Sequence, residues 1–257
     1  MKTKKDIIEN WLPRYTKRPL TDFTEFILLT NFNNYVEMFA EWFQVPVLGR
    51  DGNMINASAN GITIINFGMG SPNAALIMDI LPAVHPKAVL FIGKCGGLRE
   101  KNSIGDYILP SAAIRGEGTS NDYFPPEIPA LPTFNLQRAV SSNIRDFGKD
   151  YWTGTVYTTN RRVWEHDEEF KNYLRTTRAI AIDMETATLF SVGFHNGIST
   201  GALLLVSDMP LLEDGIKTAE SDKKVTANYV EEHLKIGVKS LSSLINNSKT
   251  IKHLRFE

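Results

Sequence analysis

The sequence predicts an α/β protein in which a largely parallel or mixed sheet is flanked by helices. Short apolar runs, typical of buried strands, alternate along the chain with segments of helical periodicity. Two of these runs lead into similar segments, DMET at residues 183–186 and SDMP at residues 207–210, in which an acid lies beside a methionine. Because α/β proteins place ligands at strand ends, we expect both acids to share one site.

Length and composition indicate one large domain. The chain has 257 residues, of which 42% are hydrophobic and 22% are charged. A chain of this size can bury a sizeable core without disulfide bonds. We therefore expect a single domain over residues 1–257, with residues 1–20 as an N-terminal arm.

Charge and cysteine usage argue against several classes of protein. The formal net charge is −1, so no global field attracts nucleic acid or an anionic membrane. Cys95 is the only cysteine, which rules out an internal disulfide and points to a reducing compartment. The basic N-terminal segment lacks the apolar core of a signal peptide, and no apolar run approaches the ~18 residues of a membrane span. These features predict a cytoplasmic protein.

The first half of the chain alternates strands and helices. Residues 1–20 are polar and contain two prolines, so we expect a turn or two of helix and an extended arm. Residues 49–61 and 115–132 are rich in turn-forming residues and are expected to be loops. The expected strands are residues 26–30, 61–67, 87–92, 105–110 and 112–114, and the expected helices are residues 31–42 and 72–81.

The second half continues the alternation and ends in a long helix. The periodicity shows no internal repeat, low-complexity tract or linker. The expected strands are residues 152–158, 178–182 and 201–206, and the expected helices are residues 135–147, 163–174, 186–192 and 222–246.

A glycine loop at Gly68 and Gly70 lies between a strand and a helix, with Ser71 as the expected N-cap of that helix. Glycines at such a position let backbone N–H groups approach an anion. The alternative is a tight turn packed against the helix. A dinucleotide-binding loop is disfavoured, because Asn73 replaces the third glycine and the next strand ends in glycine and Lys94 rather than an acid.

A second glycine-rich segment, GKCGG at residues 93–97, follows the next strand. It could wrap a phosphate or a sugar, with Lys94 adding positive charge and Gly96 allowing close approach. Cys95 could be a nucleophile, but no histidine is positioned beside it by the sequence. A small buried side chain is the favoured interpretation of Cys95.

Two cationic segments are further candidates for ligand binding. Arg115 and Thr119 in the long loop suit phosphate and hydroxyl recognition, although such a loop could be a solvated connection. Arg162 and Trp164 could bind a planar base or a phosphate, or they could precede a helix whose acidic first turn suits the helix dipole. His166 lies among these acids, but no second histidine stands at ligand spacing, so we expect no metal site.

The two acids at the strand ends have two possible roles each. Glu185, beside Met184, could accept hydrogen bonds from sugar hydroxyls. Asp208, after Ser207, could act as a general acid if burial raises its pKa. Alternatively, each acid caps the helix that follows it.

Seven stretches together resemble one known family. Taken in chain order, over about residues 25–245, these stretches resemble the nucleoside phosphorylase type I superfamily. The DMETA and VSD segments carry the resemblance to the superfamily, and IGKCGGLR, YFPPEIP and TTNRRVWE are more similar to its AMP nucleosidase branch. The seven stretches are GMGSPNAA, IGKCGGLR, IGDYILP, RGEGTSNDYFPPEIPA, TGTVYTTNRRVWE, AIAIDMETATLF and LLLVSDMP.

The resemblance implies a fold, an activity and an assembly. The fold is a three-layer α/β/α sandwich around a mixed, barrel-like central sheet, usually assembled into homo-trimers or hexamers. The activity is hydrolysis of AMP by water to adenine and ribose 5-phosphate. No metal or redox cofactor and no nucleic-acid or membrane partner is implied.

The resemblance also assigns roles to residues by motif. Met184 and Glu185 hold the ribose, with Glu185 on its hydroxyls, and Asp208 protonates or hydrogen-bonds the purine N7. These roles agree with the chemistry, because the N-glycosidic bond breaks through an oxocarbenium-like transition state and adenine is a poor leaving group unless protonated. The other expected substrate contacts are Gly70, Lys94, Cys95, Gly96, Arg115, Thr119, Arg162, Trp164 and Ser207.

The chain departs from this family in two respects. Longer AMP nucleosidases resemble it only in their C-terminal portion and carry a separate N-terminal regulatory domain, so we expect a short form and do not assume control by ATP or phosphate. Related hydrolases position water with a glutamate near the first strand, whereas this strand ends in TNFN at residues 30–33. Asn31 and Asn33 are candidates to orient the water, although neither is a strong base.

Other functions stay open at this point. The alternatives are phosphorolysis or hydrolysis of an unphosphorylated purine nucleoside, a nucleotide sensor without catalysis, and a dinucleotide-dependent enzyme.

Overall fold

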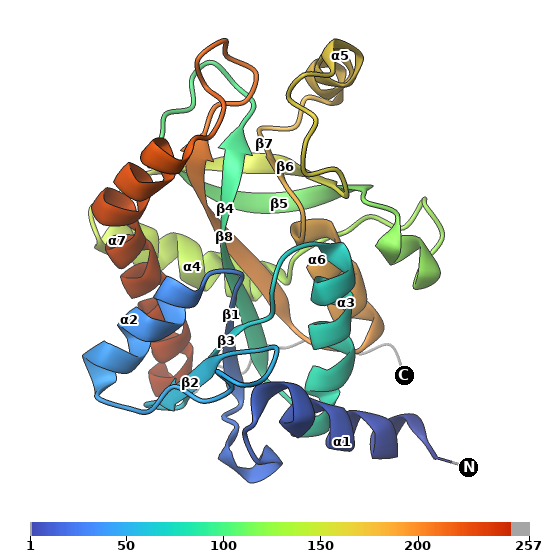
Figure 1. Cartoon of the computed structure of the whole chain (residues 1–257), viewed down its shortest axis with the longest axis vertical. Coiled ribbons are helices and arrows are strands. Elements are labelled where there is room, and N and C mark those ends of the chain that lie inside the picture. The colour runs from blue at the N-terminus through green and yellow to red at the C-terminus, as the bar shows by residue number, and fades with distance from the viewer. Residues whose placement is uncertain (1, 248–257) are drawn as a thin grey trace.

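The computed structural model describes residues 2–247 and contains a mixed sheet of eight strands within that range (Figure 1). The strands are β1 (Phe26–Thr30), β2 (Asn56–Ala59), β3 (Ile62–Asn66), β4 (Ala88–Gly97), β5 (Tyr107–Gly116), β6 (Tyr151–Thr159), β7 (Ala181–Asp183) and β8 (Thr200–Asp208). Their order is β2-β3-β1-β4-β7-β6-β5-β8, and β8 also pairs with β4. This extra pairing closes β4, β7, β6, β5 and β8 into a barrel-like ring, as the sequence resemblance implied.

Helices cover both faces of the sheet. Figure 1 shows α1, α3 and α6 on one side, and α2, α4 and α7 on the other. The helices are α1 (Lys4–Thr16), α2 (Asn33–Phe43), α3 (Ser71–Ile80), α4 (Phe134–Asp146), α5 (Glu168–Thr177), α6 (Thr186–His195) and α7 (Ala219–Asn247). Three short 3₁₀ segments are η1 (Leu20–Asp22), η2 (Leu81–Val84) and η3 (Thr119–Asp122). No helix within residues 2–247 is long and apolar enough to cross a membrane.

The central strands are buried on both faces, which explains their uninterrupted apolar sequences. In β8, Leu204 and Val206 pack with α3 and α6, whereas Leu203 and Leu205 pack with α2, α4 and α7. Parallel pairing of β1, β4 and β8 requires helical crossovers that cover both faces. The alternating packing therefore builds two cores, one on each side of the sheet.

The N-terminal segment differs from the expected arm, because residues 4–16 form the continuous helix α1. Thr3 and Asp6 make a reciprocal capping box that starts the helix. Pro13 removes one backbone donor near the helix end, and burial of Ile8 and Leu12 against the core outweighs that loss. Tertiary packing therefore overrides the prolines that predicted an extended arm.

Four other expected boundaries were wrong. The predicted loop at residues 49–61 contains β2, and the glycine segment at residues 93–97 is part of β4. The two strands predicted at residues 105–110 and 112–114 are one strand, β5, whose pairing with β6 shifts register next to Pro110. The helix predicted from residue 163 begins at Glu168 instead, capped by Asp167.

His233 of α7 is a buried residue that ties helices α7 and α2 to strand β8. Its Nε2 lies 3.0 Å from the carbonyl oxygen of Leu203, and its Nδ1 lies 2.9 Å from the hydroxyl of Tyr35. A carbonyl only accepts, so Nε2 carries the proton and Nδ1 accepts from Tyr35. Burial lowers the pKa of His233 to about 4.

The lowered pKa of His233 predicts that the free energy of unfolding falls at acidic pH. The His233 pKa is about 4 in the folded chain against an ordinary value of 6.5, so the unfolded chain binds the proton more readily. Stability should therefore fall by about 3 kcal/mol as the pH drops from 6.5 to 4. His233→Gln can keep both hydrogen bonds without titrating. Chemical denaturation across this pH range should show a flatter profile for His233→Gln, and parallel profiles would contradict the assignment.

Candidate active site

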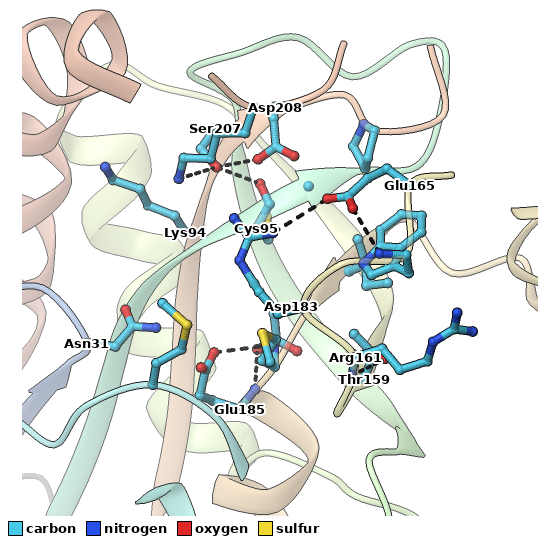
Figure 2. A pocket seen from close by; sticks show the side chains of 18 of the residues that line it. Asn31, Lys94, Cys95, Thr159, Arg161, Glu165, Asp183, Glu185, Ser207 and Asp208 are labelled. Atoms are coloured by element: carbon cyan, nitrogen blue, oxygen red, sulfur yellow. Dashed lines mark hydrogen bonds and ion pairs between the residues drawn. The ribbon is translucent and has the colours of Figure 1, made fainter. Parts of the chain in front are cut away.

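One pocket gathers nine of the twelve residues that the sequence nominated (Figure 2). It lies where β1, β4, β7 and β8 end, and Figure 2 shows Glu185 at one end of it and Asp208 at the other. The nine residues are Lys94, Cys95, Gly96, Arg162, Trp164, Met184, Glu185, Ser207 and Asp208. The two acids expected to share a site therefore do line one pocket.

A β-bulge aims Asp208 into this pocket. In the parallel pairing of β4 with β8, Cys95 lies opposite Val206 and Gly96 lies opposite Asp208. Ser207 is therefore the extra residue on β8, and bulges of this kind redirect neighbouring side chains next to functional sites. The sequence gives no sign of this bulge.

The glycines of the GKCGG segment serve packing rather than forming a loop. A Cβ on Gly96 would lie 2.8 Å from Cγ of Pro210, and a Cβ on Gly97 would lie 2.6 Å from Sδ of Met209. The segment after β8 therefore passes too close to β4 for any side chain at these positions. The segment that could have wrapped a phosphate or a sugar as a loop is part of a strand of the closed ring.

Asp208 combines burial with a close hydroxyl. The Ser207 hydroxyl donates to Oδ1 of Asp208 at 2.6 Å, and Nζ of Lys217 lies 3.5 Å from the same hydroxyl oxygen. Burial raises the pKa of Asp208 above its ordinary value, and the Ser207 hydrogen bond and the charge of Lys217 oppose this more weakly. Asp208 caps no helix, because α7 does not begin until Ala219. A carboxyl group of this kind can hold a proton for a leaving group.

Asp183 performs the capping that the sequence left open for Glu185. Its Oδ2 accepts from the backbone N–H of Thr186 at 2.8 Å, from the Thr186 hydroxyl, and from the N–H of Glu185 at 3.3 Å. Its Oδ1 accepts from the Thr158 hydroxyl at 2.7 Å, and the Thr158 oxygen accepts from the N–H of Ala187. Asp183 therefore joins β6 to the first turn of α6.

Glu185 is left with a different environment. Its side chain is buried, and its Oε1 accepts from the N–H of Gly70 at 2.7 Å. Burial, with the nearby charge of Asp183, raises the pKa of Glu185 to about 8. Glu185 makes no helix-capping hydrogen bond through its side chain to α6. Its Oε2 accepts from the N–H of Met184 at 3.3 Å, so two backbone N–H groups hold this carboxyl group at the pocket.

In the glycine loop before α3, Gly70 supports Glu185 and does not itself line the pocket. Gly70, not Ser71, is the N-cap of α3 and has φ of 89°, which favours glycine. The Ser71 hydroxyl donates to the carbonyl of Met184 at 2.7 Å. The backbone N–H of Gly70 is bonded to Glu185, and it is the neighbouring Met69 that lines the pocket; a direct contact of Gly70 with substrate stays a prediction.

Arg115 and Thr119 do not line the pocket. The Arg115 guanidinium donates to the Ser120 and Asn121 side chains and to three backbone carbonyls between residues 124 and 128. Thr119 begins the 3₁₀ segment η3 of the same loop. Arg115 is therefore the internal support of its loop, and the phosphate-binding role expected for both residues is not supported here.

Cys95 and Trp164 combine pocket contact with packing. Burial raises the pKa of the Cys95 thiol well above its ordinary value, which argues against a nucleophilic thiolate. Trp164 is buried and stacks edge-on against Phe170 of α5, with ring centroids 5.4 Å apart. Both side chains therefore shape the pocket wall.

Several pocket residues were not nominated as site residues from the sequence. Lys217 lies in the irregular segment after β8, and Phe32 follows β1, so neither belongs to a recognisable motif. Only the chain fold brings them beside Asp208 and Glu185. The full set is Phe32, Met69, Thr159, Arg161, Glu165, Ile182, Asp183, Pro210 and Lys217, and Asn31, which the sequence suggested as a candidate to orient the water, also lines the pocket. Within residues 2–247 no group of three or more His, Cys, Asp or Glu side chains could hold a metal ion.

The chain is similar to known proteins over most of its length. A model of the Phosphorylase superfamily matches residues 25–244. An AMP nucleosidase of Escherichia coli strain K12 is 32% identical over 279 aligned positions, which cover 91% of this chain. The match spans 57% of the length of that relative.

Solved structures are also similar to this chain over most of its length. The structure of an AMP nucleosidase from Bacteroides thetaiotaomicron is 58% identical, with a TM-score of 0.86, and the match covers 96% of this chain and 99% of that one. A purine nucleoside phosphorylase from Toxoplasma gondii is 20% identical with a TM-score of 0.78 over 90% of this chain and 95% of that chain. At that identity the likeness concerns the fold alone.

The different environments of the two neighbouring acids predict opposite effects on stability. Asp183→Asn loses acceptors for buried donors and should lower the free energy of unfolding by about 2 kcal/mol. Glu185→Gln removes a buried carboxyl group that ionises beside Asp183. Because burial raises the folded-state pKa of Glu185 above the unfolded value, the parent loses stability between pH 4.5 and about 8.

Thermal unfolding at pH 5 and pH 8 measures both effects. Glu185→Gln should raise the melting temperature more at pH 8 than at pH 5, and Asp183→Asn should lower it at both. Equal destabilisation by the two variants would contradict the division of roles between Asp183 and Glu185.

Proposed function

The chain belongs to the phosphorylase superfamily, and from this membership we propose that it hydrolyses AMP to adenine and ribose 5-phosphate. The observation that carries the proposal is the pairing of a buried Glu185 and a partly buried Asp208 at opposite ends of one pocket, neither of which caps a helix through its side chain. The AMP nucleosidases of E. coli and B. thetaiotaomicron support the choice of substrate.

Asp208 protonates the leaving group. When the bond between C1′ and N9 breaks, its electron pair stays with the purine, and a proton on N7 stabilises the departing base. Burial raises the pKa of Asp208, so its carboxyl group keeps a proton to higher pH than an exposed aspartate. The Ser207 hydroxyl, which donates to Oδ1, fixes the carboxyl orientation and supports the aspartate after proton transfer.

Glu185 and Met184 bind the ribose. Glu185 exchanges hydrogen bonds with the 2′- and 3′-hydroxyls, and Met184 covers an apolar face of the sugar. Positive charge that develops on the ribosyl ring favours the ionised form of Glu185, which stabilises the transition state more than the ground state. The Gly70 N–H holds the carboxylate in place during this change.

Asn31 is the residue we assign to orient the water. Its Oδ1 is buried and has no hydrogen-bond partner among the described residues, and it lines the pocket. Asn33 instead accepts a hydrogen bond from Asn66 and does not line the pocket. The water forms the bond to C1′ and releases one proton, which restores the Asp208 carboxyl. An amide acceptor suits a dissociative reaction, in which the nucleophile needs orientation rather than full deprotonation.

The remaining expectations from the sequence form part of the same proposal. We propose one catalytic domain over residues 1–257, a cytoplasmic setting, and a homo-oligomer, either a trimer or a hexamer. Support for the assembly comes from exposed apolar side chains, among them Leu131 and Phe134, which are 53% and 76% exposed. Light scattering coupled to size exclusion would measure the oligomer directly.

Removal of the Asp208 proton should abolish most turnover without abolishing binding. We expect Asp208→Asn to lower kcat for AMP by about 10² to 10⁴, the usual contribution of a general acid. Product separation should give adenine and ribose 5-phosphate from the parent without added phosphate.

Asp214→Asn is the matched control, because Asp214 is exposed in the segment that follows Asp208. Its turnover should equal that of the parent. Unchanged turnover in Asp208→Asn would remove Asp208 from the reaction. Turnover of adenosine alone, dependence on added phosphate, or AMP binding without turnover would replace the proposed activity by a nucleosidase, a phosphorylase or a sensor, respectively.

A further inference from the structure

Two lysines in the pocket converge on one carboxylate oxygen. Nζ of Lys94 and Nζ of Lys217 each lie 2.9 Å from Oδ1 of Asp222, in the first turn of α7. Both lysines line the same pocket as Glu185 and Asp208, whereas Asp222 does not. The arrangement is an anion site that is filled by a side chain of the protein itself.

The Lys94 ammonium is held in a way that leaves capacity for a ligand. Its side chain is only 3% exposed, and it donates to Asp222 and to the Thr226 hydroxyl at 3.1 Å. An ammonium has three N–H donors, so one remains after these two bonds. Nζ also lies 4.6 Å from the ring centroid of Phe32, which forms an apolar wall beside it. A charged donor in such surroundings binds an anion more strongly than one in water.

The other cations near the pocket are less suited to a phosphate. Arg161 is paired with Asp167 at 2.7 Å and lies over the ring of Phe170. Arg162 is more than half exposed and lies 3.5 Å from Glu165. Arg99 and Arg115 do not line the pocket.

The two sides of the pocket differ in chemistry. Figure 2 shows Lys94 and Asn31 on one side, and Glu165, Arg161 and Thr159 on the other, with Glu185 and Asp208 at the two ends. A ribose held at Glu185 with its base directed to Asp208 can therefore place the base against the Glu165 side. Its 5′-substituent then extends toward Lys94.

We propose that Lys94 and Lys217 bind the 5′-phosphate of the substrate, and that Asp222 holds the two lysines in place until the phosphate displaces it. This inference rests on the proposed function, since it assigns the phosphate of a nucleoside monophosphate. A phosphate monoester brings about −2 charge at neutral pH, which matches two ammonium groups better than one carboxylate does.

Asp222 is suited to leave when the phosphate arrives. Its side chain is 39% exposed, so the carboxylate can turn to solvent. It also stays in the first turn of α7, where the helix dipole favours negative charge. Without Asp222 the empty pocket would hold two unpaired ammonium groups close together, one of them buried, at a cost in stability.

The test compares ligands that differ only in the phosphate. Calorimetric titration with ribose 5-phosphate and with ribose is performed on the full chain and on Lys217→Met, Lys94→Met and Asp222→Asn. Lys224→Met is the matched control, because Lys224 lies on α7, pairs with Glu220, and does not line the pocket. The ratio of kcat/KM for AMP to that for adenosine is measured on the same proteins.

We expect each pocket lysine variant to bind ribose 5-phosphate about 10- to 100-fold more weakly, with ribose affected less than twofold. The AMP to adenosine ratio should fall by a similar factor. Asp222→Asn should bind ribose 5-phosphate more tightly than the parent, because the competing carboxylate is gone. Lys224→Met should match the parent.

Several results would overturn the inference. Unchanged binding of ribose 5-phosphate in both pocket lysine variants, or equal losses for ribose and ribose 5-phosphate, would remove the lysines from phosphate recognition. Weaker binding by Asp222→Asn would make Asp222 a required support and not a displaceable anion. If the parent binds ribose 5-phosphate through these lysines but does not cleave AMP, the proposed function fails and the phosphate site stands.

Discussion

The hydrogen bonds of Asp183 are the constraint on which the site depends. Asp183 accepts from the first turn of α6 and from Thr158 of β6, so it fixes the helix relative to the closed ring of strands. Because Asp183 satisfies the free N–H groups of that helix end, Glu185 is not needed as a cap. The carboxyl group of Glu185 is left buried at the pocket with the N–H of Gly70 as its support. Capping of α6 by Asp183 thus leaves the carboxyl group of Glu185 available for the role proposed for it.

The second acid is placed by a different device. Closure of β4 against β8 requires glycine at positions 96 and 97, and the extra residue Ser207 turns Asp208 toward the pocket. The two carboxyl groups proposed to act in the reaction therefore come from separate strand ends and have separate environments. Glu185 has another acid beside it, whereas Asp208 has a hydroxyl and the Lys217 charge nearby. This difference suits the roles proposed for them, in which one acid stabilises a cation and the other supplies a proton.

The sequence predicted the parts of the fold that depend on local pattern. Strands such as residues 26–30 and 201–206 are buried on both faces, so their apolar runs were decisive. Gly96 and Gly97 were misplaced in a loop, because the reason for glycine there is the close approach of Pro210 and Met209 across the ring. Lys217 was missed for a related reason, since only tertiary structure brings it next to Lys94 and Asp222. Contacts between distant segments leave no periodic pattern to detect.

The most direct test of the division of labour varies the leaving group. 4-Nitrophenyl β-ribofuranoside 5-phosphate releases nitrophenolate, which needs no proton to depart. On this substrate Asp208→Asn should keep a kcat within about tenfold of the parent, whereas Glu185→Gln should lose about 10² or more, because the ribosyl cation still needs its carboxylate. Equal impairment of Asp208→Asn on the nitrophenyl substrate and on AMP would contradict the assignment of Asp208 as the acid for the leaving base.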